Sequence, residues 1–290
     1  MAIIVDEKNL PVIVQGITGH QGSFHAQQMK LFGTNIVGGV TPGRGQTRSA
    51  GFPVFDSVKE AVENTGAKAS VIFVPAPYAP DAVIEAIDSG IKLIVIITEH
   101  IPFHDMVKVK LYARLKGSRL IGPNGPGMAS VGLAKLGIMP NSIFRQGSVG
   151  VVSRSGTLTY EIVNTISESG LGETTVIGIG GDQVVGTKMQ EVVQLFERDP
   201  ETKAIVMVGE IGGTAEEETA EIIKNSVSKP AVGFIAGRYA PPGKRMGHAG
   251  AIITGNKGTA ESKINALNEA GIRVASTPNE IPEILKQLIR

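Results

Sequence analysis

Residues 11–22 read PVIVQGITGHQG, and this short stretch decides the expected fold. The apolar run PVIV has the pattern of a buried strand. The glycines Gly16, Gly19 and Gly22 follow it in a G-x-x-G-x-x-G spacing and lead into a helix. Such a turn lets the backbone N–H groups of a helix N-terminus meet a phosphate. The stretch therefore predicts a Rossmann-like unit, although a turn that only packs a helix on a strand has the same spacing.

The alternation of strand and helix continues beyond this turn. Further strands of the first half are predicted at residues 35–40, 69–75, 91–98 and 118–123, and helical spacing occurs between them, as in residues 81–90. Continuous apolar runs joined by helices are typical of a parallel sheet covered on both faces. The first domain is therefore expected to be Rossmann-like and to span residues 1–122.

The same alternation restarts after residue 147. Strands are predicted at residues 148–156, 174–181, 203–210, 229–237 and 272–277. The Gly- and Pro-rich segment before them, residues 123–147, has little helical periodicity and is expected to be a linker. The class is thus α/β, with a Rossmann-like domain followed by a flavodoxin-like parallel-sheet domain at 148–290.

Composition narrows the class of protein. The 290 residues carry 28 Lys and Arg against 27 Asp and Glu, so no basic surface indicates nucleic acid or anionic lipid. There is no cysteine, which excludes disulfides and thiolate chemistry. No apolar run approaches the roughly 20 residues that cross a bilayer, and the N-terminus lacks a signal-peptide pattern. A cytoplasmic protein with small molecules or proteins as partners is expected.

The residues at the end of the second predicted strand indicate which nucleotide ligand the first domain binds. An NAD site needs an acidic residue there for the ribose, but the sequence has Thr41, Pro42 and Arg44. Arg44 suits a phosphate, which leaves NADP or a phosphorylated adenosine such as coenzyme A.

Two more loops follow strands of the first sheet. Val74 and Pro75 begin a proline-rich loop that predicts an apolar wall for an adenine or a pantetheine arm, and Thr98 and Glu99 in the loop after Ile97 offer hydrogen bonds to its amides. His100 and His104 lie near two acids, but Pro102 prevents a helix from aligning them, so no metal site is predicted.

The second half contains a further strand, turn and helix in VVSRSGTLTYE. Ser155, Gly156 and Thr157 are expected in the first turn of the helix, where free N–H groups and hydroxyls form an anion site. A serine hydrolase elbow is disfavoured because Ser153 and Thr157 replace its flanking glycines. A simple N-cap explains only one of these hydroxyls.

His248 lies in the glycine-rich stretch GKRMGHAGAII, residues 243–253, beside Lys244 and Arg245. A neutral imidazole is a good nucleophile toward phosphorus, and the two cations favour an approaching phosphate. Glu210 at another strand end is the candidate orienting acid. A phosphorylated histidine is the sharper hypothesis, and a structural or general-base histidine remains the alternative.

Over essentially its whole length the chain resembles the α subunit of succinyl-CoA synthetase (succinate–CoA ligase). The motifs that carry this resemblance are, in order, QGITGHQG, GGVTPGRG, VPAP, ITE, GPNGPG, VSRSGTLTYE, GIGGD, GEIGG and GKRMGHAGAI. The resemblance implies that His248 is phosphorylated, Glu210 orients it, Ser155 and Gly156 cradle phosphate, and Tyr160 contacts substrate. It implies contacts to coenzyme A from Thr18, Gly19, His20, Gln21, Arg44, Ile97, Thr98 and Glu99.

Three positions depart from the family pattern. Arg44 stands where lysine is usual, His20 where serine is common, and Gly125 where many members have cysteine. A thiol at position 125 is therefore not required in this protein.

The resemblance also implies a reaction and a partner. Succinate and CoA form succinyl-CoA through a phosphohistidine and succinyl phosphate, and a β subunit with an ATP-grasp domain binds ATP or GTP with Mg²⁺, in an αβ or α2β2 assembly. The chain itself has no G-x-x-x-x-G-K-[ST] loop. The alternatives are a malate–CoA or other acyl-CoA ligase, a non-catalytic CoA-binding module, and an NADP dehydrogenase, which lacks an evident hydride-transfer site here.

Overall fold

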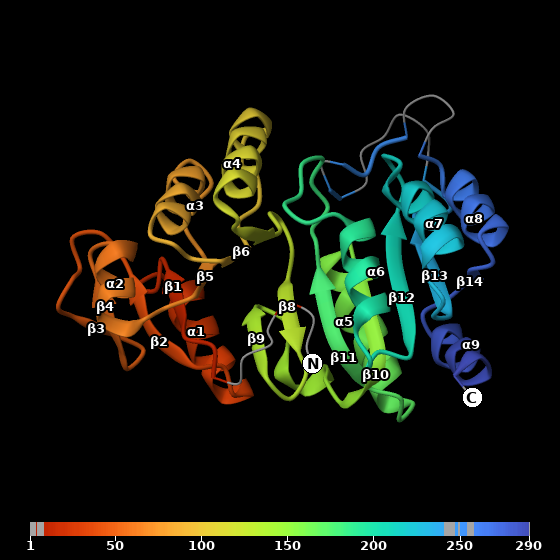
Figure 1. The fold of residues 1–290 in the computed structure, drawn as a ribbon, viewed down its shortest axis with the longest axis horizontal. Coiled ribbons are helices and arrows are strands. Elements are labelled where there is room, and N and C mark those ends of the chain that lie inside the picture. Colours follow the sequence, from red (N-terminus) through yellow and green to blue (C-terminus); the bar gives the residue numbers. More distant parts are fainter. Residues whose placement is uncertain (1–3, 5–8, 241–246, 249, 254–257, 290) are drawn as a thin grey trace. The chain divides into compact units, whose positions relative to one another are not determined.

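The computed structural model describes residues 4, 9–240, 247–248, 250–253 and 258–289. The chain forms two compact units that meet in the sequence between Asn141 and Ser142, and the short segment Val184–Gly186 belongs with the N-terminal unit (Figure 1). Each unit contains a mostly parallel sheet with helices between successive strands. The predicted α/β class is therefore confirmed.

The sheet of the N-terminal unit has the strand order β3-β4-β2-β1-β5-β6-β7, and only the β3–β4 pair is antiparallel. Numbered along the chain without the short β3, the strands follow the order 3-2-1-4-5-6 of the Rossmann fold. The strands are β1 (Val12–Gln15), β2 (Ile36–Val40), β3 (Arg48–Ser49), β4 (Phe52–Phe55), β5 (Ala69–Ile72), β6 (Leu93–Ile96) and β7 (Arg119–Ile121).

Three helices of this unit pack on one face of the sheet in a common apolar core, and these are α2 (Val58–Thr65), α3 (Ala79–Asp88) and α4 (Phe103–Lys116). Helix α1 (His20–Phe32) packs instead against the hairpin of β8 (Gly127–Ser130) and β9 (Ala134–Gly137), where the N–H of Gly137 donates to Met29 Sδ at 3.3 Å.

The C-terminal unit has five parallel strands in the order β14-β13-β12-β10-β11. Numbered along the chain and read from the other edge this is 2-1-3-4-5, the flavodoxin order. A 3-10 turn (Asn141–Ile143) spans the boundary between the units in the sequence, and the elements of the C-terminal unit that follow it are β10 (Gln146–Ser153), α5 (Gly156–Glu168), β11 (Glu173–Gly178), α6 (Met189–Arg198), β12 (Ala204–Glu210), α7 (Ala215–Ser226), β13 (Ala231–Ala236), α8 (Ala260–Glu269), β14 (Arg273–Ala275) and α9 (Glu280–Leu288).

The ten strands predicted from apolar runs are all present, and four others were missed. The missed strand β4 carries Pro53 and follows two glycine-containing turns, a composition that argues against a strand in a sequence. Strands β8 and β9 lie in the segment expected to be a linker. No helix among the described residues combines the length and apolar character needed to cross a membrane.

Candidate functional site

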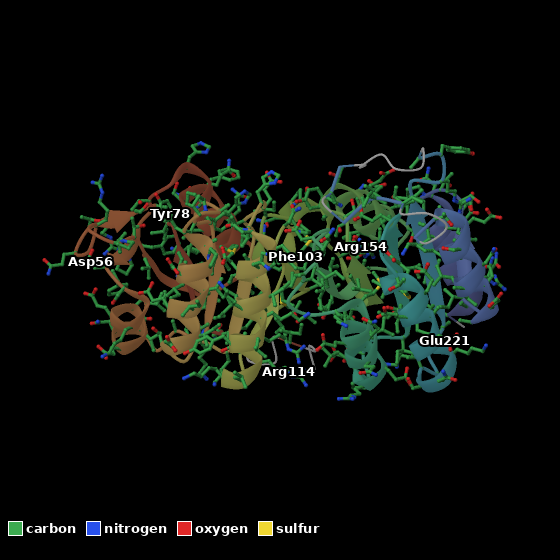
Figure 2. The ribbon with its side chains drawn as sticks, turned by 90° about the horizontal axis from the view of Figure 1, so that it is seen from above. Asp56, Tyr78, Phe103, Arg114, Arg154 and Glu221 are labelled. Carbon is green, nitrogen blue, oxygen red and sulfur yellow. The ribbon has the colours of Figure 1, made fainter. Side chains whose placement is uncertain are left out.

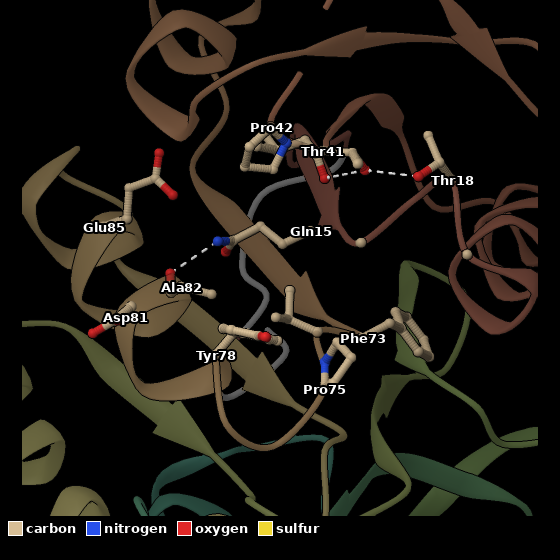
Figure 3. A pocket seen from close by; sticks show the side chains of 14 residues that line it. Gln15, Thr18, Thr41, Pro42, Phe73, Pro75, Tyr78, Asp81, Ala82 and Glu85 are labelled. Atoms are coloured by element: carbon tan, nitrogen blue, oxygen red, sulfur yellow. Dashed lines mark hydrogen bonds between the residues drawn. The ribbon is translucent and has the colours of Figure 1, made fainter. Parts of the chain in front are cut away.

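A cavity of about 690 Å³ opens at the carboxyl ends of β1, β2 and β5 in the N-terminal unit (Figure 3). The strand order of the sheet reverses between β1 and β5, and ligands of open α/β sheets bind at such a switch point. The lining residues are Gln15, Gly16, Thr18, Gly19, Val40, Thr41, Pro42, Phe73, Val74, Pro75, Tyr78, Asp81, Ala82 and Glu85.

The glycine turn forms one side of the cavity. Gly16 has a φ of +80°, and a Cβ on Gly22 would lie 2.2 Å from the carbonyl oxygen of Gly16, so the helix approaches the turn too closely for a side chain. Helix α1 begins at His20, and its N-cap residue Gly19 makes no side-chain capping bond. The N–H groups of the first helical turn, which have no partner within the helix, are thus available to an anion.

Two hydroxyl groups line the cavity, that of Thr18 in the turn after β1 and that of Thr41 directly after β2. Thr18 Oγ1 donates to Thr41 Oγ1 at 3.1 Å, and Thr41 Oγ1 donates to the carbonyl oxygen of Val40 at 2.8 Å. A carboxylate that would bind both ribose hydroxyls of NAD is replaced here by the Thr41 hydroxyl. The structure thus agrees with the sequence in disfavouring a plain NAD site.

The opposite sides of the cavity differ in polarity, as Figure 3 shows. Phe73, Val74 and Pro75 form an apolar wall, whereas helix α3 contributes the carboxyl groups of Asp81 and Glu85. The carboxylate of Glu85 accepts a hydrogen bond from the N–H of Val58 at 2.8 Å. A ligand with an apolar ring and one phosphate-bearing end fits this division, with its phosphate toward the glycine turn.

Four of the residues predicted to bind coenzyme A line this cavity: Thr18, Gly19, Val74 and Pro75. Six others do not line it. His20 and Gln21 are exposed at the start of α1, Arg44 is exposed in the turn after β2, and Ile97, Thr98 and Glu99 follow β6. The hydroxyl of Thr98 donates to the carbonyl oxygen of Val74 at 2.6 Å, so it supports the wall from behind.

Sequence reasoning missed several lining residues. Gln15 is buried within β1, where its amide donates to the carbonyl oxygen of Ala82 at 2.8 Å and accepts from Ser70 Oγ at 2.7 Å. Tyr78 and the two acids belong to α3 and its N-cap, which follow the proline-rich loop. A polar residue in the last position of an otherwise apolar strand was the signal that could have found Gln15.

A second constellation lies at the carboxyl ends of the strands in the C-terminal unit. His248 Nδ1 is 2.8 Å from Glu210 Oε2, and Glu210 is the last residue of β12. The carboxylate only accepts, so Nδ1 carries the proton and Nε2 keeps a lone pair when the ring is neutral. The hydrogen bond to Glu210 raises the pKa of His248, although burial acts in the opposite direction.

The imidazole is fixed from two sides. A Cβ on Gly181, in the loop after β11, would lie 2.3 Å from Cγ of His248, so only glycine leaves room for the ring. The N–H of Gly250 donates to the carbonyl oxygen of Gly181 at 3.1 Å and ties the histidine segment to the same loop. The side chain of His248 keeps an exposure of 25%, which leaves the ring accessible.

Arg154 is the next residue after β10 and lies beside Glu210. Its Nη2 is 3.5 Å from Glu210 Oε1, and its Nη1 donates to Glu216 Oε1 at 3.0 Å. Burial would lower the pKa of Arg154, but the charges of Glu216 and Glu210 outweigh it and raise that pKa. Sequence reasoning did not single out this arginine.

The predicted phosphate cradle forms the start of α5. Ser155 is the N-cap, and its Oγ accepts a hydrogen bond from the N–H of Leu158 at 3.4 Å, while Gly156 and Thr157 occupy the first helical turn. Tyr160 is half-buried in the same helix, and burial raises its pKa. The helix begins two residues after Arg154, so its N-terminus lies at the same edge of the sheet as Glu210.

The two cations predicted to attract phosphate beside His248, Lys244 and Arg245, lie outside the described residues. Within the part of the chain that the structure describes, no group of three or more His, Asp or Glu side chains is placed to hold a metal ion.

Comparison with known proteins agrees with this division of the chain. Residues 7–100 match the model of the CoA binding domain, and residues 152–273 match the model of the CoA-ligase family. The chain is 60% identical over its full length, and over that of the relative, to the succinate–CoA ligase [ADP-forming] subunit alpha 2 of Archaeoglobus fulgidus. It is 57% identical to the corresponding alpha subunit of Staphylococcus aureus, over 98% of this chain and 94% of the relative.

Two solved structures of ATP citrate lyase have the same fold as this chain over almost its whole length. ATP citrate lyase of Methanosaeta concilii in complex with (3S)-citryl-CoA superimposes with a TM-score of 0.90 at 26% identity, over 99% of this chain. The chain spans about half of that citrate lyase chain, with 50% covered. The ATP citrate lyase of Methanothrix soehngenii in complex with citrate and coenzyme A has a TM-score of 0.88 and 26% identity, over 99% of this chain and 50% of its own.

A CoA-binding domain followed by a CoA-ligase domain defines the chain as a protein of the CoA ligase class. Within that class, the chain belongs to the family of succinate–CoA ligase alpha subunits.

Proposed function

We propose that this chain is the catalytic alpha subunit of a succinate–CoA ligase and forms succinyl-CoA from succinate and CoA through a phosphohistidine at His248. The observation that carries the proposal is the 2.8 Å contact between His248 Nδ1 and Glu210 Oε2, which leaves Nε2 as the free nucleophile. The names of the two relatives support succinate as the acid and ATP as the nucleotide.

The reaction divides into three transfers. The Nε2 lone pair bonds to the γ-phosphorus of the nucleotide, and the bridging P–O bond breaks with ADP as the leaving group. A carboxylate oxygen of succinate then attacks the phosphorus, and the P–N bond breaks to give succinyl phosphate and free His248. The CoA thiolate finally attacks the acyl carbon, and inorganic phosphate leaves with the electrons of the C–O bond.

The residues of this chain have separate roles in these transfers. The first turn of α5, with Ser155, Gly156 and Thr157, would hold the phosphoryl oxygens through N–H groups and hydroxyls. Glu210 orients the imidazole and stabilises it while it bears the phosphoryl group. Tyr160 is the proposed contact to succinate.

The cavity of the N-terminal unit is the proposed CoA site. Its glycine turn suits the phosphates, and its wall of Phe73, Val74 and Pro75 suits the adenine or the pantetheine arm. His20, Gln21, Arg44 and residues 97–99 would extend the contacts beyond the cavity. The ATP citrate lyase of Methanothrix soehngenii was solved in complex with citrate and coenzyme A, and its likeness to this chain supports the assignment.

The name "subunit alpha" of the relatives supports a partner subunit. We propose a beta subunit with an ATP-grasp domain that binds ATP or GTP with Mg²⁺, in an αβ or α2β2 assembly located in the cytoplasm. The domain boundaries proposed for the chain are residues 1–122 and 148–290, joined by 123–147.

Phosphate transfer tests the proposal directly. The chain is mixed with its copurified beta subunit, Mg²⁺ and γ-labelled ATP or GTP, and the alpha chain is assayed for acid-labile, base-stable label. We expect label in the wild type and in His104→Asn, which changes an exposed histidine of α4, and none in His248→Asn. Succinate plus CoA should discharge the label, and absence of label with both nucleotides would contradict the proposal.

A further inference from the structure

A set of four buried charged side chains lies behind His248, and we call Arg154, Glu210, Glu216 and Lys263 the buried ion cluster. Their side chains are at most 8% exposed, and those of Glu216 and Lys263 are 0% exposed. Two cations face two carboxylates, so the formal charges of the cluster cancel. Figure 2 labels two charged residues of the C-terminal unit, Arg154, which is buried, and Glu221, which is exposed.

Arg154 connects the two carboxylates of the cluster. One guanidinium nitrogen is 3.5 Å from Glu210 Oε1, and the other donates to Glu216 Oε1 at 3.0 Å. The same nitrogen donates to the carbonyl oxygen of Gly212 at 3.0 Å, so the guanidinium is held by several acceptors. These contacts fix its position relative to the end of β12.

Glu216 anchors this arrangement from the first turn of α7. Its Oε1 also accepts the N–H of Glu210 at 3.1 Å, and its Oε2 contacts Lys263 Nζ. Burial would raise the pKa of Glu216, but the charges of Arg154 and Lys263 outweigh it and lower that pKa. Glu216 thus holds both the backbone of Glu210 and the arginine that faces the Glu210 side chain.

The two oxygens of Glu210 have different partners. Oε2 bonds to His248, whereas Oε1 is buried and has no hydrogen-bond donor among the described residues. The ion pair with Arg154 is therefore the compensation available to Oε1. Without Arg154, a protonated His248 would be the cation in contact with this carboxylate among the described residues, and a protonated imidazole has no lone pair on Nε2 with which to attack phosphorus.

We propose that Arg154 is a positioning residue that balances the charge of Glu210, so that Glu210 orients the imidazole of His248 without holding it in the protonated, non-nucleophilic form. Arg154 acts through Glu210 and need not touch the reacting atoms. The inference rests on the proposed phosphoryl transfer at His248 and deepens it.

The charges around His248 change its pKa in the directions that this role of Arg154 requires. The hydrogen bond and the charge of Glu210 raise the pKa of His248, and Asp182 raises it further, whereas burial and the charge of Arg154 lower it. The other charges are further from His248: Glu216 contacts Arg154, Lys263 contacts Glu216, and Glu217 contacts Lys263. Loss of Arg154 therefore removes an effect that keeps the ring neutral.

The pKa of His248 measured by NMR tests the inference. The chain is labelled at histidine Cε1, and the signal of His248 is assigned among the five histidines by its absence in His248→Asn. In Arg154→Met we expect this pKa to rise by about one unit or more, because the cation that lies 3.5 Å from the Glu210 carboxylate is lost. Arg154→Lys, which keeps the charge, should stay near the wild type. Arg198→Met, at an exposed arginine in the last turn of α6, is the matched control and should leave the pKa unchanged.

A second variant tests the inference in case Arg154→Met does not fold. Arg154→Met with Glu216→Gln removes one cation and one carboxylate, so the remaining buried charges still cancel, and the same rise in the pKa of His248 is expected. An unchanged or lowered pKa in whichever of the two variants folds would overturn the inference.

The rate of label uptake provides an independent readout. In the variants its pH profile should move to higher pH with the pKa, and at a pH below the pKa of both proteins uptake should fall about 10-fold for a shift of one unit. The pKa is measured without any phosphate donor. A shifted pKa without label in the wild type would therefore refute the proposed function and leave in place only the effect of Arg154 on the charge of His248.

Discussion

The charge of Glu173 should lower the stability of the C-terminal unit, because this carboxyl group is buried. Glu173 begins β11 and is 0% exposed. Its carboxylate accepts a hydrogen bond from Ser167 Oγ at 3.1 Å and another from the N–H of Arg145 at 3.4 Å. Burial raises the pKa of Glu173 to about 8, and these hydrogen bonds offset the rise only in part.

The direction of the pH effect follows from linkage. Because the folded protein binds this proton more tightly than the unfolded chain, the contribution is fully present below the unfolded pKa, 4.5, and is lost as the pH rises through about 8. One pKa unit corresponds to about 1.4 kcal/mol, so the free energy of unfolding should fall by roughly 3 kcal/mol between pH 5 and pH 8.

The substitution Glu173→Gln isolates this effect. Glutamine keeps an oxygen acceptor for Ser167 and Arg145 but never ionises. The variant should be close to the wild type in Tm at pH 5 and roughly 6–12 °C above it at pH 8, as measured by scanning calorimetry. Glu168→Gln, at an exposed glutamate ending α5, should show no such divergence. A difference in Tm between wild type and Glu173→Gln that is the same at pH 5 and pH 8 would refute the reasoning.

The remaining predictions concern the two sites. Gly181→Ala should reduce label uptake at His248 by about 10-fold or more, because its Cβ would lie 2.3 Å from the imidazole and break the bond to Glu210, a charge-assisted bond of about 1.5–3 kcal/mol. Label uptake and Tm measured together separate this from unfolding, and normal uptake in a folded variant would show that the ring tolerates the methyl group. Arg44→Ala should weaken CoA binding by roughly 10-fold in calorimetry, whereas Arg44→Lys should retain most of the affinity; equal affinities of the Ala variant and the wild type would remove Arg44 from the CoA site.

Much of the fold could be predicted because it depends on local patterns. The runs that became β1, β5, β6 and β12 are buried along their whole length, so their mostly apolar sequences identified them. The same rule failed for β4, where Pro53 interrupts a short strand near the edge of the sheet. The hairpin of β8 and β9 has three glycines at or beside its strands, so its composition is that of a loop.

The residues of the candidate sites were predicted only in part. His248 and Glu210 are 38 positions apart, and both were singled out because each has a chemically suitable side chain in a glycine-rich or strand-end context. Arg154 was not, because an arginine next to a serine-rich turn looks like any exposed cation. Gln15 and the α3 acids were missed because the cavity joins elements distant in the chain.

The sequence by itself determined the alternation of strands and helices, the glycine turn, the absence of thiol chemistry and the choice of an imidazole as the candidate nucleophile. These depend on residue type and on spacing within one element. Only the tertiary structure decided that Lys263, Glu216 and Arg154 are buried together behind Glu210, and that the carboxylate of Glu173 is buried with hydrogen-bond donors but without an ion pair among its described contacts. The physical reason is that the energy of a charge depends on the solvent and the charges around it, and those surroundings are assembled from parts of the chain that no local pattern connects.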